Sequence, residues 1–182
     1  MSNKLIKSLP QLVGIGTILF FAYKFDIPNK HLYMKILAGF FVLILLYLLL
    51  HYVSSRIEQK RYLESDFSKI DKMTGIEFEH YLKVQFEKLG YRVSLTPARG
   101  DYGADLILSK DGEKIAVQAK RHTQKVSNKA VQEVVAAIHH YKCNRGMVIT
   151  NSVYTSNAIH LAKDCGIELW DRKKITEVFQ IK

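Results

Sequence analysis

Residues 100–120 read GDYGADLILSKDGEKIAVQAK, and this stretch decides the fold of the second part of the chain. Two segments with the composition of strands, 104–108 and 114–120, flank the dipeptide Asp111-Gly112. Asp-Gly between two such segments is typical of a tight hairpin turn. We therefore predict two antiparallel strands that are joined at this turn.

Three polar residues of the hairpin are candidates for chemistry. Asp105 lies inside the first predicted strand, and Gln118 and Lys120 stand two residues apart on the second, so these two share one face. Pairing of the strands brings Asp105 close to them at one end of the hairpin. A carboxylate, an amide oxygen and a lysine can together hold Mg²⁺ and direct water at a phosphodiester. The alternative is a surface hairpin whose charges only keep a sheet edge soluble.

The segments around the hairpin complete an α/β sandwich. A helix begins near residue 73, where Thr74 and Glu77 form a capping-box pattern, and it ends at Gly90. A strand at 91–95 precedes the hairpin, and a helix capped by Ser127 follows it. The remaining predicted elements are a strand at 147–150, a helix at 155–164, a strand at 167–170 and a helix at 172–180. The order αβββαβαβα over residues 73–182 is long enough for one core.

Residues 1–53 are strongly apolar, and we predict that they form a membrane anchor of two helices. Residues 32–53 contain one formal charge, Lys35, and these 22 residues span roughly 33 Å as a helix. The earlier apolar stretch, 9–23, is shorter and crosses a bilayer only if flanking apolar residues such as Phe25 and Ile27 are included, which gives a predicted span of about 9–27. Residues 54–72 are charged and contain neither Gly nor Pro, which predicts a helical stalk.

The charge distribution predicts both orientation and partners. The whole chain has 27 Lys and Arg against 17 Asp and Glu, a formal charge of +10, which favours a polyanionic partner. Two cysteines, with no CxxC motif and no His/Cys cluster at finger spacing, argue against a disulfide scaffold and a zinc finger. Basic residues gather after the second predicted span, which predicts that the downstream domain is cytoplasmic: Arg56, Lys60, Arg61, Lys69 and Lys72.

Several motifs in a fixed order resemble a known family. GDYGAD at 100–105, followed by VQAKR at 117–121, resembles the PD-(D/E)xK nuclease superfamily and, more narrowly, the catalytic domain of Mrr-type restriction endonucleases in their QxK form. Residues 74–79, 131–133 and 155–169 extend the resemblance, which covers about 73–175. It does not include the predicted anchor, where Mrr-type enzymes generally carry a DNA-recognition domain.

The resemblance implies roles for individual residues. Asp105 matches the metal-binding carboxylate, Gln118 the substituted second acidic position, and Lys120 the catalytic lysine. Glu79 matches an accessory metal-binding carboxylate, although a solvated helix charge is the alternative. Asp101 either takes part in catalysis or only stabilises the glycine-rich turn. The implied cofactor is Mg²⁺, with Mn²⁺ as a substitute.

A second group of residues is expected to meet DNA. These are Arg99, Arg121, Lys125 and Gln132, with His122 and Lys129 near them. A scattered solvated surface is the alternative for the basic residues, and a plain helix surface is the alternative for Gln132.

These inferences together predict a membrane-anchored, metal-dependent DNA endonuclease of the restriction type. The expected partners are DNA, the lipid bilayer and, as an open alternative, a second copy of the chain in a homodimer. The competing functions are a catalytically weak module that tethers DNA to the membrane and a structure-selective repair nuclease.

Overall fold

The computed structural model describes residues 30–97 and 102–181. The chain divides into two compact units, Met1–Ile57 and Glu58–Lys182. Each unit is described by itself.

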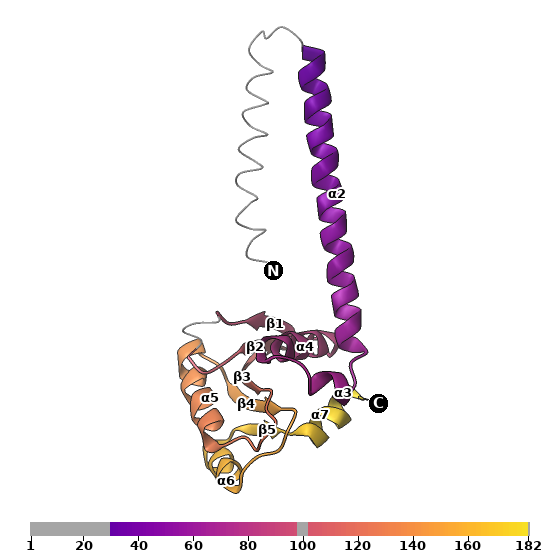
Figure 1. Cartoon of the computed structure of the whole chain (residues 1–182). Coiled ribbons are helices and arrows are strands. Elements are labelled where there is room, and N and C mark those ends of the chain that lie inside the picture. The colour runs from indigo at the N-terminus through magenta and orange to yellow at the C-terminus, as the bar shows by residue number, and fades with distance from the viewer. Residues whose placement is uncertain (1–29, 98–101, 182) are drawn as a thin grey trace. The chain divides into compact units, whose positions relative to one another are not determined.

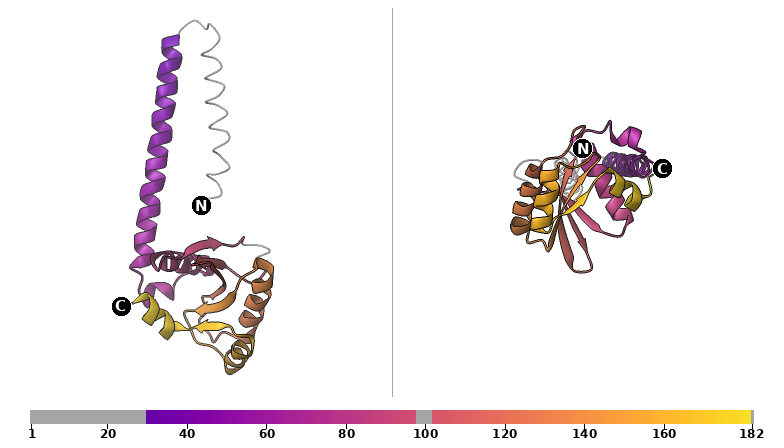
Figure 2. Two further views of the ribbon diagram at one scale, coloured as in Figure 1. Left: turned by 180° about the vertical axis from the view of Figure 1, so that it is seen from behind. Right: turned by 90° about the horizontal axis from the view of Figure 1, so that it is seen from below.

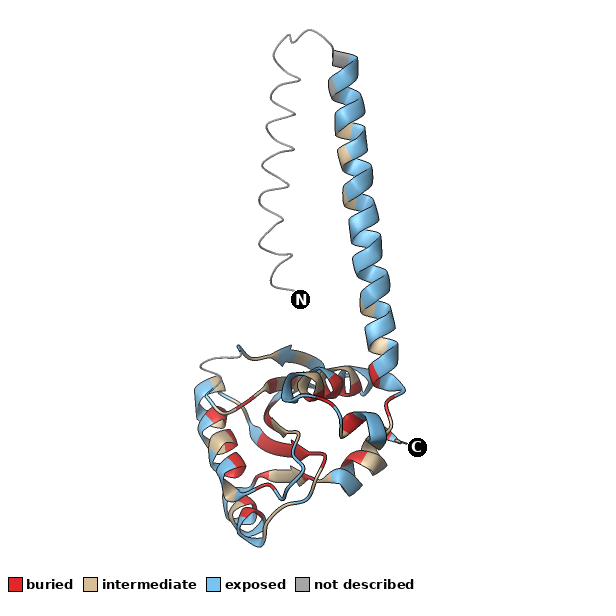
Figure 3. Cartoon of the chain, in the orientation of Figure 1, coloured by how far each residue is buried: buried red, intermediate tan, exposed pale blue. Residues whose placement is uncertain are grey.

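The first unit contains most of helix α2, Lys30–Leu63. Among the described residues this is the one helix, from Met34 onward, that is long and apolar enough to cross a membrane. Most of the α2 ribbon is coloured as exposed (Figure 3), and its exposed residues include large apolar ones such as Phe41 and Leu50. The predicted span at 32–53 lies within α2, whereas the one at 9–27 lies outside the described residues. Length and composition support a membrane span at α2, and spanning stays a prediction.

The second unit has the element order that the sequence predicts. After the end of α2 and a short helix, α3 (Phe67–Ile70), the order is αβββαβαβα. The elements are α4 (Gly75–Lys88), β1 (Arg92–Leu95), β2 (Leu106–Lys110), β3 (Glu113–Lys120), α5 (Asn128–Tyr141), β4 (Arg145–Thr150), α6 (Ser156–Cys165), β5 (Glu168–Trp170) and α7 (Arg172–Phe179).

The five strands form one mixed sheet in the order β1-β2-β3-β4-β5 (Figure 1). The pairs β1/β2 and β2/β3 are antiparallel, whereas β3/β4 and β4/β5 are parallel. The predicted hairpin turn is confirmed: Asp111 and Gly112 have φ values of 52° and 82°, as the favoured two-residue turn requires. In this strand order, β3 lies at the centre of the sheet and is paired with β2 on one side and β4 on the other.

Helices cover both faces of the sheet (Figure 2). α4 and α7 pack on one face, and α5 and α6 on the other. Successive residues of β3 point to opposite faces, so Val117 packs in the core with α4 whereas Ala116 packs in the core with α5. Gln118 and Lys120 follow the phase of Ala116 and point toward the α5 face.

The segment before α4 is part of the packed domain. Tyr62, near the end of α2, and Ile70, in α3, are both buried in the core with α4. The buried Gln85 side chain of α4 also donates a hydrogen bond to the Tyr62 carbonyl, at 3.3 Å. The predicted stalk at 54–72 is thus helical through Leu63, and its later residues lie against α4.

Two predicted helix caps have different outcomes. The capping box of α4 is confirmed, because Thr74 Oγ1 accepts from the Glu77 amide and the Glu77 carboxylate accepts from the Thr74 amide. The side-chain cap at Ser127 is wrong, since that hydroxyl makes no capping bond to α5. The chain before α5 is held instead by backbone bonds between Val126 and the segment after β4, at Val153 and Thr155.

Candidate active site

Asp105 lies at the point where the β2/β3 ladder ends. Its backbone amide donates to the Val117 carbonyl at 2.8 Å, and its carbonyl accepts from Thr96 at 3.0 Å. The prediction that Asp105 stands inside the strand is wrong by one residue, because β2 begins at Leu106. Beyond the last ladder pair, the Ala119 amide donates to Asp105 Oδ2 at 2.7 Å, so the carboxylate takes the place of a further strand residue.

Gln118 lies beside this carboxylate. Its Nε2 donates a hydrogen bond to Asp105 Oδ2. Gln118 is 3% exposed, and a buried amide requires a partner of this kind. The structure therefore brings Asp105 and Gln118 together in a partly buried position on the α5 side of the sheet.

Lys120 is the last residue of β3 and is held at both its backbone and its side chain. Its carbonyl accepts a hydrogen bond from the Thr150 hydroxyl, at 2.6 Å, from the neighbouring strand β4. Its Nζ lies 2.9 Å from Oε2 of Glu133 on α5. Both side chains of this ion pair are about two-thirds buried, which protects the pair from full solvent screening.

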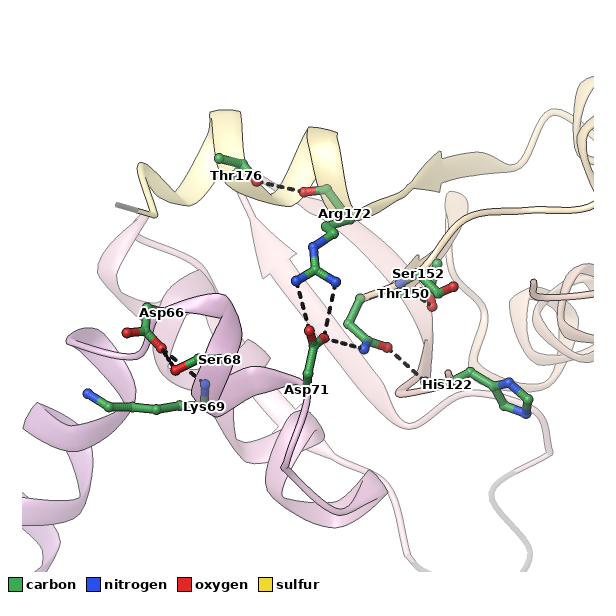
Figure 4. Close-up of polar contacts among 10 residues, drawn as sticks. Asp66, Ser68, Lys69, Asp71, His122, Thr150, Ser152, Arg172 and Thr176 are labelled. Carbon is green, nitrogen blue, oxygen red and sulfur yellow. Dashed lines mark hydrogen bonds and ion pairs between the residues drawn. The ribbon is translucent and has the colours of Figure 1, made fainter. Parts of the chain in front are cut away.

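A hydrogen-bond network fixes the chain just after Lys120 (Figure 4). The buried Asn151 accepts from the His122 amide at 2.8 Å and donates to Asp71 Oδ1 at 2.8 Å. Arg172, at the start of α7, donates to both oxygens of Asp71, at 2.7 and 3.3 Å. Burial works against the charge of Asp71, but the hydrogen bonds from Asn151 and Arg172 outweigh it and lower the pKa of this carboxyl. The end of the predicted catalytic strand is thereby tied to the segment that precedes α4.

The loop before Asp105 packs against α5 at two places. The Tyr102 ring stacks on His140, with centroids 3.7 Å apart. Gly103 has a φ of +90°, and a Cβ at this position would lie 2.2 Å from the Glu133 carbonyl oxygen. Glycine is required here both by the backbone conformation and by the close approach of the helix.

A cavity of about 450 Å³ opens beside Lys120. Its lining is mainly basic and polar: Lys120, His122, Gln124, Lys125, Val126, Ser127, Lys129, Ala130 and Glu133. Such a groove can accept phosphate groups next to the lysine. Of the predicted DNA contacts, Lys125 lies in this lining, whereas Gln132 is exposed on α5 and is not part of it.

The other predicted DNA contacts are placed differently. Arg121 is half-buried, and its Nε donates to the Met73 carbonyl just before α4, so this side chain links β3 to the N-terminal segment. Arg99 and Asp101 lie outside the described residues.

The metal-ligand set remains a prediction. Asp105 offers carboxylate oxygens of the type that Mg²⁺ prefers, whereas the Gln118 amide turns its Nε2 toward Asp105, so Gln118 would bind the ion through its other amide atom, Oε1. Glu79 is half-buried on α4, the helix that covers the opposite face of the sheet from the Asp105 and Lys120 side chains. Within residues 30–97 and 102–181, no three His, Cys, Asp or Glu side chains form a group that could hold a metal ion. A divalent ion bound at Asp105 and Gln118 would take its remaining ligands from water and substrate phosphate.

Glu133 and Asn151 were not predicted as site residues, although Glu133 falls within the segment 131–133 of the family resemblance. The helical periodicity of α5 could have indicated Glu133. Ala130, Val134 and Ala137 form the buried face, and Glu133, three residues after Ala130, lies next to that face. Gln132 falls on the exposed side in the same phase. No local pattern marks Asn151, whose partners are distant in sequence.

Comparisons with known proteins find similar solved structures and a matching family model. The crystal structure of AF1548, a protein of unknown function, has a TM-score of 0.49 and 18% identity, and the match covers 56% of this chain and 62% of that chain. The DNA modification-dependent restriction endonuclease AspBHI has a TM-score of 0.52 and 21% identity, with coverage of 68% and 35%. The chain thus spans less than two-thirds of the length of either structure, and the likeness to AspBHI shows the fold. No curated protein matches the chain.

A family model described as restriction endonuclease, Mrr_cat, matches residues 70–179, which is more than half of the chain. The matched range includes the whole Asp105, Gln118 and Lys120 site and all five strands. The chain belongs to the Mrr_cat restriction endonuclease family.

Proposed function

We propose that the protein is a Mg²⁺-dependent DNA endonuclease of the restriction type, anchored to the membrane through α2 with the second unit in the cytoplasm. The observation that carries the nuclease proposal is the convergence of Asp105, Gln118 and Lys120 at the end of β3, in a chain of this family. The apolar length of α2 and the basic residues that follow it support the anchoring.

The described residues have separate roles in this proposal. Asp105 and Gln118 would hold Mg²⁺, which when bound stabilises negative charge on the phosphate. Lys120 would stabilise the charge that develops on the phosphate during cleavage. Lys125 and Lys129, in the groove next to Lys120, would bind the DNA backbone without reading its sequence.

The proposal is tested with the full chain in detergent micelles, incubated with plasmid DNA and with Mg²⁺, Mn²⁺ or EDTA. We expect cleavage that requires a divalent ion. Asp105→Asn and Lys120→Ala should each abolish cleavage and leave DNA binding largely intact, because phosphate contacts come from other residues. Matched controls are Asp164→Asn and Lys163→Ala, which remove the same charges from the exposed surface of α6.

The choice of DNA separates the alternatives. Because AspBHI is modification-dependent, methylated plasmid is compared with unmodified plasmid, and a branched substrate tests the repair-nuclease alternative. Binding with a steep salt dependence, but without cleavage of any substrate under any metal, would refute the nuclease proposal and favour a DNA tether.

The membrane part of the proposal needs its own test. A single cysteine placed at Ser68, after removal of the two native cysteines, should resist an impermeant thiol reagent in intact cells and react after lysis. Labelling in intact cells would refute the cytoplasmic orientation.

A further inference from the structure

The negatively charged partner of Lys120, Glu133, lies on helix α5 and not on a strand. The Lys120 ammonium lies 2.9 Å from Glu133 Oε2. Glu133 belongs to α5, the helix that follows β3 after a connecting loop. Side chains at 118 and 120 share the α5 face of the strand, and the residue at 118 is an uncharged glutamine. The strand itself therefore provides no carboxylate next to Lys120 at that position.

The position of Glu133 is set by the same loop that carries Asp105. Gly103, two residues before Asp105, approaches the Glu133 backbone so closely that a Cβ would meet its carbonyl oxygen, carbonyl carbon and Cα at 2.2, 2.6 and 2.9 Å. A shift of α5 toward this loop is thus sterically blocked. The Glu133 carboxylate is presented to Lys120 from a backbone that is packed directly against the site.

Glu133 and Lys120 also line the same groove. A lysine side chain has four rotatable bonds and loses substantial conformational entropy when it is held in one place. An ion pair with a partly buried carboxylate orients the ammonium before DNA arrives.

We propose that Glu133 is a positioning residue that holds Lys120 in place and supplies, from α5, the negative charge that the strand lacks at Gln118. This inference rests on the nuclease function proposed above. It has a specific consequence: a carboxylate on the strand at position 118 can replace the carboxylate on the helix at position 133.

The test is a double-mutant cycle in the full chain, with Glu133→Gln, Gln118→Glu and the double variant. Glu133→Gln should lower the single-turnover cleavage rate by about a hundredfold, with unchanged thermal unfolding and no loss of DNA affinity. The double variant should recover to within about tenfold of the wild type, because the charge beside Lys120 is restored. Glu87→Gln is the matched control, because it breaks an ion pair with Lys83 on α4 and should change nothing at the site.

A second readout does not depend on activity. The rate at which an amine-acylating reagent modifies Lys120 is followed by mass spectrometry. Glu133→Gln should raise this rate, and the double variant should bring it back toward the wild-type value. A merely structural role for Glu133 would not give this reversal in a variant that remains folded.

Two results would overturn the inference: wild-type cleavage by Glu133→Gln, or a double variant no better than Glu133→Gln alone. If the wild type cuts no DNA, the nuclease proposal fails, and the acylation rates still decide whether Glu133 holds Lys120. An acylation rate that is the same in all variants would show that it does not.

Discussion

Substitution of Gly103 by alanine tests how closely the loop before Asp105 is packed against α5. The new Cβ would lie 2.2 Å from the Glu133 carbonyl oxygen and 2.6 Å from the carbonyl carbon, and the backbone φ of +90° is itself unfavourable for alanine. Both clashing atoms belong to the backbone of a helix, so no side-chain rotation can relieve the contact.

The expected decrease in the free energy of unfolding of Gly103→Ala has two separable parts. A left-handed backbone conformation costs a residue other than glycine about 1–2 kcal/mol. Forcing α5 and the loop apart adds about 1–3 kcal/mol, the range for overpacking in a close-packed interior. The total, about 2–5 kcal/mol, is a large part of the roughly 5–15 kcal/mol by which a domain is stable.

Gly112 provides the matched control for this experiment. Its φ is +82°, and a Cβ there would meet nothing within 4 Å, so Gly112→Ala carries the backbone cost alone. Urea unfolding of the full chain in micelles can be followed by the fluorescence of Trp170, the single tryptophan, which is 8% exposed in the core. We expect Gly103→Ala to lose about 1–3 kcal/mol more than Gly112→Ala. Equal losses in the two variants would refute the argument that the approach to Glu133 constrains the loop.

Three further outcomes follow from the site. Asn151→Ala removes two hydrogen bonds of a buried side chain, to the His122 amide and to Asp71, and should lower the free energy of unfolding by about 1–3 kcal/mol, clearly more than Asn144→Ala, whose exposed side chain accepts one backbone bond; equal effects in urea unfolding would contradict this. Because the folded-state pKa of Asp71 is lowered, its carboxylate stabilises the fold above the unfolded-state pKa of about 4, and this stability is lost on acidification. Asp71→Asn should therefore reduce the fall in the free energy of unfolding as the pH is lowered below about 4. The same fall in the variant and the wild type would refute the lowered pKa of Asp71. Lys125→Ala should weaken DNA binding and reduce its salt dependence by about one unit of slope, whereas Lys163→Ala on α6 should leave titrations at several salt concentrations unchanged.

Local patterns predicted most of the fold. The Asp111-Gly112 turn and the Thr74–Glu77 capping box each depend on residues within a few positions of one another. The hairpin alone brings Asp105 next to Gln118, because a turn of known length fixes which residues of the two strands meet.

The remaining part of the site depends on contacts between distant elements. The rotation of α5 about its axis determines which of its side chains meets Lys120. A rotation by one residue position would bring Gln132 toward Lys120 in place of Glu133. Asn151 bonds to Asp71, 80 positions earlier in the chain, and Asp71 bonds to Arg172, 101 positions later. No periodicity or motif encodes such pairs. The Ser127 cap shows the opposite case, in which a residue typical of a local role does not perform it.

The central position of β3 has a consequence for how the protein opens. Lys120 and Gln118 belong to a strand that is hydrogen-bonded to a neighbour on each side, and Thr150 and Asn151 secure its end. Backbone amides in such a strand exchange with solvent only when the whole domain unfolds, whereas frayed or loop segments exchange through small local openings. Within the second unit, the doubly paired residues 115–117 of β3 are thus expected to exchange slowest, and Gln118 and Lys120 continue the same strand just beyond its ladder with β2. Any rearrangement that admits DNA must therefore occur in the segments around the strand, and the strand itself acts as the fixed frame against which they move.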